Sequence, residues 1–121
     1  MTLEQSIGQL LWCGWGEAPE ADPQRCNDHA RFLVEELQVG GLALFARNLG
    51  DPEAIAALTE ELRSRSRLPP LIGIDQEGGR VSRMALPGMV FPGNMPLGLL
   101  DDPELTRKVA RSIGEQLAAV G

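Results

Sequence analysis

Four charged side chains follow an apolar run near the middle of the chain. Residues 71–74 are apolar, and Asp75, Glu77, Arg80 and Arg83 come directly after them. Two carboxylates can divide the work of a general acid and a general base, and arginine forks bind carboxylates, phosphates or sugar hydroxyls. Proteins built from alternating strands and helices place such groups at the carboxyl ends of buried strands. We therefore expect a functional site in this stretch.

The spacing of Asp75 and Glu77 leaves three interpretations open. On an extended chain they face the same side at about 6 to 7 Å, and the carboxylate pairs of glycosidases lie about 5 to 9.5 Å apart. The structural alternative is that Asp75 caps the turn after the strand while Glu77 pairs with Arg80 or Arg83. A site for a hard cation would need oxygen ligands beyond these two carboxylates.

The glycines and arginines that follow also have two interpretations each. Gly78 and Gly79 give the backbone freedom to turn close to a ligand or to another strand. Nucleotide binding is excluded, because the glycine spacing and the lysine of phosphate-binding loops are missing and a long loop follows. On a net acidic chain, Arg80 and Arg83 could each form a simple surface ion pair.

The composition predicts a globular protein without a polyanionic partner. The chain has 121 residues, 43% of them hydrophobic, and a net charge of -6. Nucleic acids and anionic membranes are bound through basic patches, so we expect neither as a partner. No apolar run approaches the about 20 residues that span a bilayer, and the N-terminus lacks the pattern of a signal peptide, a basic segment followed by an apolar one. We therefore expect a cytoplasmic protein.

The remaining reactive and aromatic side chains favour packing over chemistry. Cys13 and Cys26 lack the spacing of a zinc site, and His29 is the single histidine, so we expect no metal and no cofactor. We expect two buried or idle thiols, with a disulfide or a redox role as the alternative. Trp12 and Trp15 are expected to pack in or beside the core and not to stack on a sugar.

Helix starts are predicted by capping signals. Thr2 and Gln5 form a capping box ahead of apolar residues at helical spacing. Three Asp-Pro pairs each predict a helix, because aspartate suits the N-cap and proline the first helical position. These pairs are Asp22-Pro23, Asp51-Pro52 and Asp102-Pro103.

Between these helices lie three apolar segments that we interpret as strands. They fall at 11–16, 39–45 and 71–74. Alternating strands and helices predict an α/β fold with about three parallel strands. Residues 84–100 are expected to form a long apolar loop over the end of the sheet, beside Asp75 and Arg83. Three strands leave two open edges, through which the chain could associate with itself.

The sequence of residues 74–83, Ile-Asp-Gln-Glu-Gly-Gly-Arg-Val-Ser-Arg, resembles the signature of glycoside hydrolase family 3, in particular its bacterial β-N-acetylhexosaminidase branch. Segments 7–11, 40–48 and 91–98 agree with this family in order and spacing. The resemblance covers essentially the whole chain. It implies that residues 1–121 are the N-terminal part of a (β/α)8 catalytic barrel, with no second domain.

The resemblance also implies a function and two binding residues. Members of this branch release terminal β-linked N-acetylglucosamine, in the best-known cases from muropeptides during cytoplasmic peptidoglycan recycling. The aspartate that matches Asp75 binds sugar hydroxyls in the non-reducing-end subsite, and the arginine that matches Arg83 also contacts the sugar. The expected partner is thus a saccharide or muropeptide that contains N-acetylglucosamine, with Asp75 as a binding group and not the nucleophile.

The catalytic residues of the family have no counterpart in this chain. Its nucleophile, its acid/base loop and its Lys-His sugar-binding pair lie on later strands, and a complete barrel needs about 250 residues. We therefore expect these residues alone not to hydrolyse a glycoside. The alternative is a non-catalytic half-barrel that serves in binding or assembly, which a stable, discrete oligomer in solution would favour.

Overall fold

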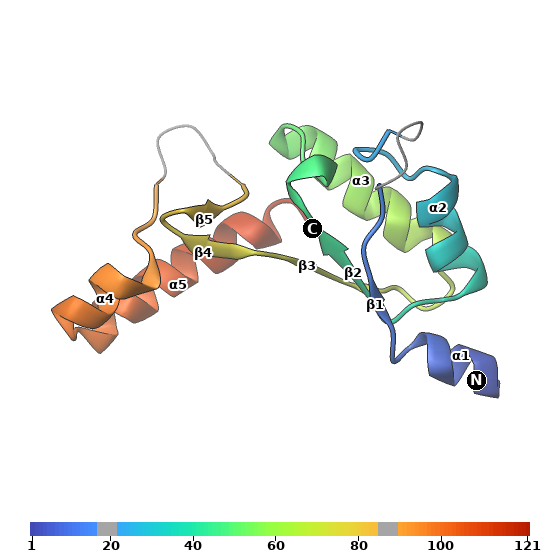
Figure 1. The fold of residues 1–121 in the computed structure, drawn as a ribbon, viewed down its shortest axis with the longest axis horizontal. Helices are drawn as coiled ribbons and strands as arrows, with labels where there is room; N and C mark the ends of the chain where they lie inside the picture. The colour runs from blue at the N-terminus through green and yellow to red at the C-terminus, as the bar shows by residue number, and fades with distance from the viewer. Residues whose placement is uncertain (17–21, 85–89) are drawn as a thin grey trace. The chain divides into compact units, whose positions relative to one another are not determined.

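The structure, a computed structural model, describes residues 1–16, 22–84 and 90–121, and these form two compact units. The first runs over Met1–Ile74 and the second over Asp75–Gly121. Figure 1 shows the elements of both. Within the described ranges no helix is long and apolar enough to cross a membrane.

The first unit alternates helices with three strands, as the sequence predicts. Its elements are α1 (Leu3–Gly8), β1 (Trp12–Cys13), α2 (Asp28–Arg31), the π-helix η1 (Phe32–Glu36), β2 (Gly41–Leu44), the 3₁₀-helix η2 (Ala46–Asn48), α3 (Pro52–Arg65) and β3 (Leu71–Ile74). The strand order is β1-β2-β3 and both pairings are parallel. The predicted α/β fold is therefore confirmed.

The capping predictions hold for three of the four helix starts. Thr2 forms the complete capping box of α1, and the Asp51 carboxylate accepts a hydrogen bond from Ala54 N at 2.8 Å at the start of α3. The prediction for Asp22-Pro23 is wrong, because α2 begins only at Asp28. The Asp22 carboxylate caps a local turn at 22–25, and the helix takes its cap from Asn27 instead.

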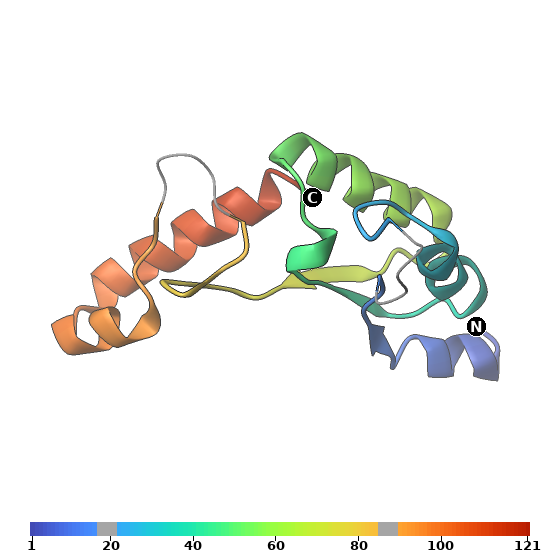
Figure 2. The ribbon, with the colours of Figure 1, turned by 45° about the horizontal axis from the view of Figure 1, so that its top comes forward.

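The core of the first unit lies between the sheet and the helices α2, η1 and α3. Figures 1 and 2 show these helices on the same side of the sheet, and side chains from all three pack against β2. The main members of this core are Trp15, Ala30, Leu33, Val34, Leu42, Leu44, Leu58 and Leu62. Successive right-handed crossovers in one direction place their helices on one face, which is the arrangement of a barrel wall.

The opposite face of the sheet carries small residues under a tryptophan. Because side chains alternate along a strand, Gly41 and Gly73 point away from the Leu42 side. A Cβ atom at Gly41 would lie 2.3 Å from Cε3 of Trp12, and one at Gly73 2.8 Å from its Cζ2. The indole of Trp12 thus lies across both glycines while staying 55% exposed. Trp15 is buried in the core, as predicted, whereas Trp12 lies on the face opposite the core and is largely exposed.

The two thiols differ in their surroundings, which makes their reactivity a test of the fold. Both are free; Cys26 is buried just before α2 and Cys13 is half-buried. Burial, and then the carboxylate of Glu61, raise the pKa of the Cys26 thiol. We expect iodoacetamide at pH 8 to alkylate Cys26 at least about tenfold more slowly than Cys13 in the native chain, since the thiolate is the reactive form. Peptide mass mapping checks this, and equal native rates would contradict the buried position of Cys26.

The second unit contains a hairpin and two helices. Its elements are β4 (Gln76–Gly78), β5 (Val81–Ser82), α4 (Asn94–Leu100) and α5 (Pro103–Ala118). The strands β4 and β5 are antiparallel, and Asp102 caps α5 through the amides of Glu104 and Leu105. The prediction of one long loop over 84–100 is wrong from residue 94 on, where α4 forms. Residues 85–89, near the start of that segment, lie outside the described ranges.

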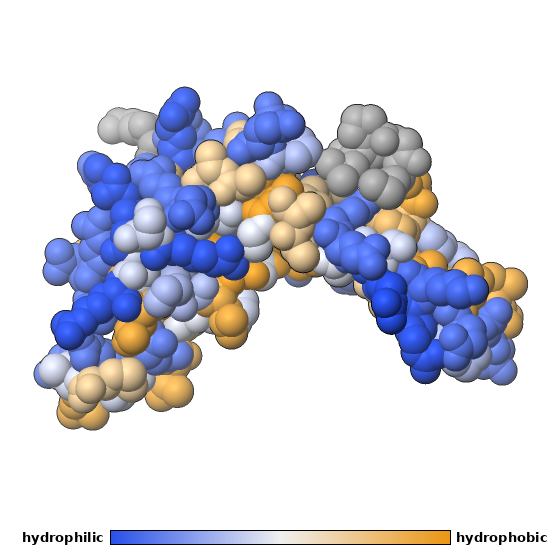
Figure 3. Space-filling view, turned by 180° about the vertical axis from the view of Figure 1, so that it is seen from behind, coloured by the Kyte–Doolittle hydropathy of each residue, from blue (hydrophilic) through white to orange (hydrophobic). Residues whose placement is uncertain are grey.

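Two helices expose apolar side chains that the described residues of their own unit leave uncovered. In the first unit these are Leu3 and Ile7 on α1, and in the second Met95, Leu99 and Leu100 on α4. Figure 3 shows hydrophobic residues among the polar ones at the surface. Apolar surface of this kind is typical of segments that pack against further protein.

Candidate functional site

Asp75 lies where the sequence places it, at the carboxyl end of a parallel strand. The last residue of β3, Ile74, pairs with Leu44, the last residue of β2. Asp75 follows Ile74 directly and its side chain is exposed. Because the site in α/β folds lies at the carboxyl ends of the strands, this position favours a binding or catalytic carboxylate.

The side chain of Gln76 holds the returning strand of the hairpin in place. Its Oε1 accepts hydrogen bonds from the backbone amides of Arg83 at 2.7 Å and Met84 at 3.1 Å. Its Nε2 donates to Ser82 Oγ at 3.2 Å and to Met84 O at 3.0 Å. One half-buried amide group therefore fixes three consecutive residues. Nothing in the sequence pattern alone singles out this glutamine.

The Gln76 contacts bring the backbone of Arg83 next to that of Asp75. Arg83 is eight residues further along the chain, but its amide is bound by the side chain of the residue that follows Asp75. The Arg83 side chain itself is exposed, whereas Met84 is only 4% exposed. The hairpin thus anchors Met84 and presents Arg83 to solvent.

The charged side chains of residues 75–83 form no ion pairs with the described residues. Asp75, Glu77, Arg80 and Arg83 are all exposed, and none of them forms an ion pair there. The interpretation of Glu77 as the ion-pair partner of Arg80 or Arg83 is therefore wrong. Nor do the described residues hold a group of three or more potential metal ligands.

The glycine pair lets the hairpin tip pack against the segment ahead of α4. Gly78 has φ +80 and Gly79 φ +57, the left-handed region in which other residues are strained. Gly79 N donates to Phe91 O at 2.8 Å, and a Cβ atom at Gly78 would lie 2.3 Å from Pro92 O. The pair therefore meets another chain segment closely, which is one of the two roles that the sequence suggests for it.

In the first unit, a buried amide joins the loops after β1 and β2. Asn48 is 1% exposed, accepts a hydrogen bond from Phe45 N at 2.9 Å and donates to Pro23 O at 2.9 Å and Trp15 O at 3.4 Å. The neighbouring Arg47 donates from Nε to Trp15 O at 2.8 Å, with its guanidinium 4.7 Å from the Phe45 ring centre. Reasoning from the sequence missed this network; an asparagine just beyond a buried strand is its only signal.

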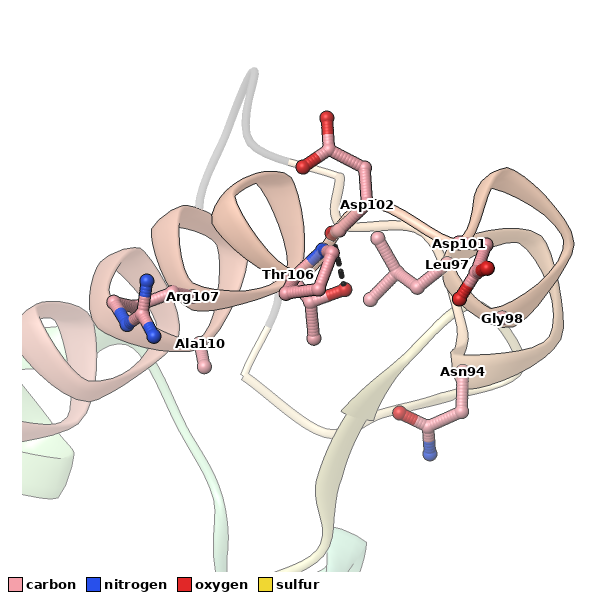
Figure 4. A pocket seen from close by; sticks show the side chains of 9 residues that line it. Asn94, Leu97, Gly98, Asp101, Asp102, Thr106, Arg107 and Ala110 are labelled. Atoms are coloured by element: carbon pink, nitrogen blue, oxygen red, sulfur yellow. Dashed lines mark hydrogen bonds between the residues drawn. The ribbon is translucent and has the colours of Figure 1, made fainter.

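The second unit also has a hollow of about 430 Å³ between α4 and α5. Figure 4 shows Leu97 and Thr106 facing it, whereas the carboxylate of Asp102 points away. Two of its polar groups form contacts within the first turns of α5: Thr106 Oγ1 donates a hydrogen bond to Asp102 O at 3.0 Å, and Arg107 forms an ion pair with Glu104. Neither Asp75 nor Arg83 lines it, so we do not place the site there.

The first unit is an α/β domain of strand-helix units, and Asp75 follows directly after its third parallel strand. The N-terminal domain of glycosyl hydrolase family 3 matches residues 2–121. The chain therefore belongs to glycosyl hydrolase family 3, and its three parallel strands are part of that family's barrel domain.

Curated relatives support the same membership. The chain is 41% identical over 101 residues to a β-hexosaminidase from Thiobacillus denitrificans, which covers 82% of this chain and 28% of the relative. It is 33% identical to β-hexosaminidase A from Pseudoalteromonas piscicida, covering 100% of this chain and 23% of the relative. The chain thus spans about a quarter of the length of these relatives.

Solved structures share the fold over nearly the whole chain. A family 3 β-N-acetylglucosaminidase from Paenibacillus sp. matches with a TM-score of 0.89 at 40% identity, covering 99% of this chain and 22% of that one. NagZ from Neisseria gonorrhoeae, solved with N-trifluoroacetyl-D-glucosamine, matches with a TM-score of 0.77 at 24% identity, covering 92% of this chain and 33% of that one. At this identity the second match supports the fold alone.

Proposed function

We propose that this chain is the sugar-binding N-terminal part of a β-N-acetylhexosaminidase barrel and that Asp75 and Arg83 contact a terminal β-linked N-acetylglucosamine. The observation that supports the proposal is the Gln76 network, which ties the backbone of Arg83 to the residue that follows Asp75 while both charged side chains remain exposed. The relatives described above, a β-hexosaminidase and a β-N-acetylglucosaminidase, support it.

The chemistry of the two groups suits a pyranose ring. A carboxylate accepts hydrogen bonds from two sugar hydroxyls, and a guanidinium donates several in a fixed plane. Hydrolysis through a glycosyl intermediate needs in addition a nucleophile and an acid/base group. We assign neither to this chain, so its role is to bind and orient the sugar for groups on other parts of the barrel.

The biological setting is part of the same proposal. N-acetylglucosamine at the non-reducing end of muropeptides is the substrate that we favour, with cytoplasmic peptidoglycan recycling as the process. This rests on the resemblance of residues 74–83 to the bacterial branch of the family. A β-N-acetylglucosaminide with a peptide-bearing aglycone is the substrate to compare with a simple aryl glycoside.

Replacing the guanidinium tests the binding role. We expect Arg83→Ala to raise the dissociation constant of N-acetylglucosamine at least about tenfold, because charge-assisted hydrogen bonds to the sugar are lost. The measurement is a titration of the ¹⁵N-labelled 121-residue chain followed by NMR. Arg67→Ala is the matched control, since Arg67 is exposed and precedes β3. Unchanged affinity in Arg83→Ala would refute the assignment of Arg83.

A second assay tests whether the chain binds the sugar without hydrolysing the glycosidic bond. The purified chain should not cleave p-nitrophenyl N-acetyl-β-D-glucosaminide, whereas the Thiobacillus denitrificans β-hexosaminidase serves as the positive control. Turnover by the chain that disappears in Asp75→Asn or Glu77→Gln would show that one of these carboxylates is the nucleophile or the acid. That result would overturn our view that Asp75 only binds.

A further inference from the structure

We infer that Gln76 is a positioning residue, which fixes the backbone of Arg83 so that its guanidinium meets the sugar. This inference deepens the proposed function and rests on it. Gln76 itself sits in the hairpin with its amide turned to the returning strand. It acts on the ligand through Arg83 and does not need to touch the ligand itself.

The hydrogen-bond pattern requires an amide at this position. On one side, two backbone N–H groups donate to Oε1, and on the other side the Met84 carbonyl needs a donor, which is Nε2. An amide offers an acceptor and a donor at the two ends of one planar group, and glutamine carries it at the length that reaches all of these partners. A carboxylate would place an oxygen against Met84 O, and asparagine is one methylene too short to hold the same position.

Three of the four hydrogen bonds of the Gln76 amide are half-buried, and the fourth, to Arg83 N, is exposed. Gln76 and Ser82 are half-buried, and Met84 is buried. Water competes less well for the three half-buried bonds, to Ser82 Oγ and to the N–H and C=O of Met84, than for the exposed bond to Arg83 N, and an unpaired half-buried amide would be costly. Residues 80–83 otherwise hold few restraints, because β5 comprises only Val81–Ser82 and the register shifts between Gln76 and Gly78. Without the Gln76 network, Arg83 would sample more backbone conformations, and ordering it on binding would lower the affinity.

The test uses the full 121-residue chain with Gln76→Met, which keeps the length of the side chain and removes all four hydrogen bonds. We expect hydrogen exchange at the amides of Arg83 and Met84 to accelerate at least about tenfold, the equivalent of one lost hydrogen bond. The dissociation constant of N-acetylglucosamine should rise about tenfold. Gln76→Glu, which keeps the acceptor oxygen, should fall between the wild type and Gln76→Met in both measurements.

A double variant separates positioning from general loss of structure. If Gln76 acts through Arg83, then Gln76→Met adds no further loss of affinity in an Arg83→Ala background. The matched control is Gln9→Met, which removes a single hydrogen bond, from Nε2 to Gln38 O at 2.6 Å in the first unit. That variant should change neither the Arg83 amide exchange nor the affinity.

The outcomes distinguish this inference from the proposed function. Loss of affinity in Arg83→Ala together with full affinity in Gln76→Met would overturn the role of Gln76 and leave the proposed function standing. Equal further losses from Gln76→Met with and without Arg83 would also overturn it, because Gln76 would then act on its own. No change in Arg83→Ala, or no sugar binding by the wild type, would overturn the proposed function and this inference with it.

Discussion

Asn48→Leu should lower the free energy of unfolding by about 3 to 5 kcal/mol, because each buried partner left without a hydrogen bond costs about 1 to 3 kcal/mol. The variant removes the hydrogen bonds of Asn48 to Phe45 N and to the carbonyl oxygens of Pro23 and Trp15, and leaves these groups beside an apolar side chain of similar size. Asn48 is the buried polar group that joins the loops after β1 and β2, so we expect it to be the most sensitive polar position of the first unit.

Urea unfolding followed by circular dichroism measures this loss. Asn94→Leu is the control, since Asn94 is exposed at the start of α4 and should change the stability by less than about 0.5 kcal/mol. If Asn48→Leu unfolded at the same urea concentration as the wild type, the loops after β1 and β2 would not depend on this amide, and the network at Asn48 would have no energetic weight.

Gly78→Ala should move the hairpin tip away from the segment 91–93 and lower the free energy of unfolding by about 2 to 3 kcal/mol, because the backbone is strained and the new Cβ clashes. Its φ of +80 is unfavourable for alanine, and the new Cβ would lie 2.3 Å from Pro92 O. The atom it meets belongs to the backbone, so no side-chain rotation relieves the contact. Thermal unfolding of the second unit and hydrogen exchange at Gly79, whose amide is bound by Phe91 O, measure the effect.

Gly98→Ala is the matched control for this substitution. Gly98 lies within α4 and has no atom within 4 Å of an added Cβ. Alanine there should stabilise the helix by about 0.5 to 1 kcal/mol. Opposite signs for the two variants are the expected result. A neutral Gly78→Ala with unchanged exchange at Gly79 would show that the hairpin tip does not depend on this close approach.

Local signals in the amino-acid sequence were enough to predict the α/β class, the three strands and most of the helix starts. These features depend on local signals: apolar runs that suit buried strands, and caps such as Thr2, Asp51 and Asp102 that bond to amides two or three residues away. The family signature at 74–83 is equally local. The prediction failed at Asp22 because Asn27 offers a competing cap further on.

The residues that hold the candidate site together could be identified only from contacts in the folded chain. The bonds from Gln76 to Arg83 and Met84 span seven and eight residues, and those of Asn48 to Trp15 and Pro23 span 33 and 25. No sequence period or motif specifies such pairs, because they depend on where separate segments meet once the chain has folded. The sequence therefore determined that Asp75 and Arg83 were available, and the fold decided that Gln76 brings their backbones together.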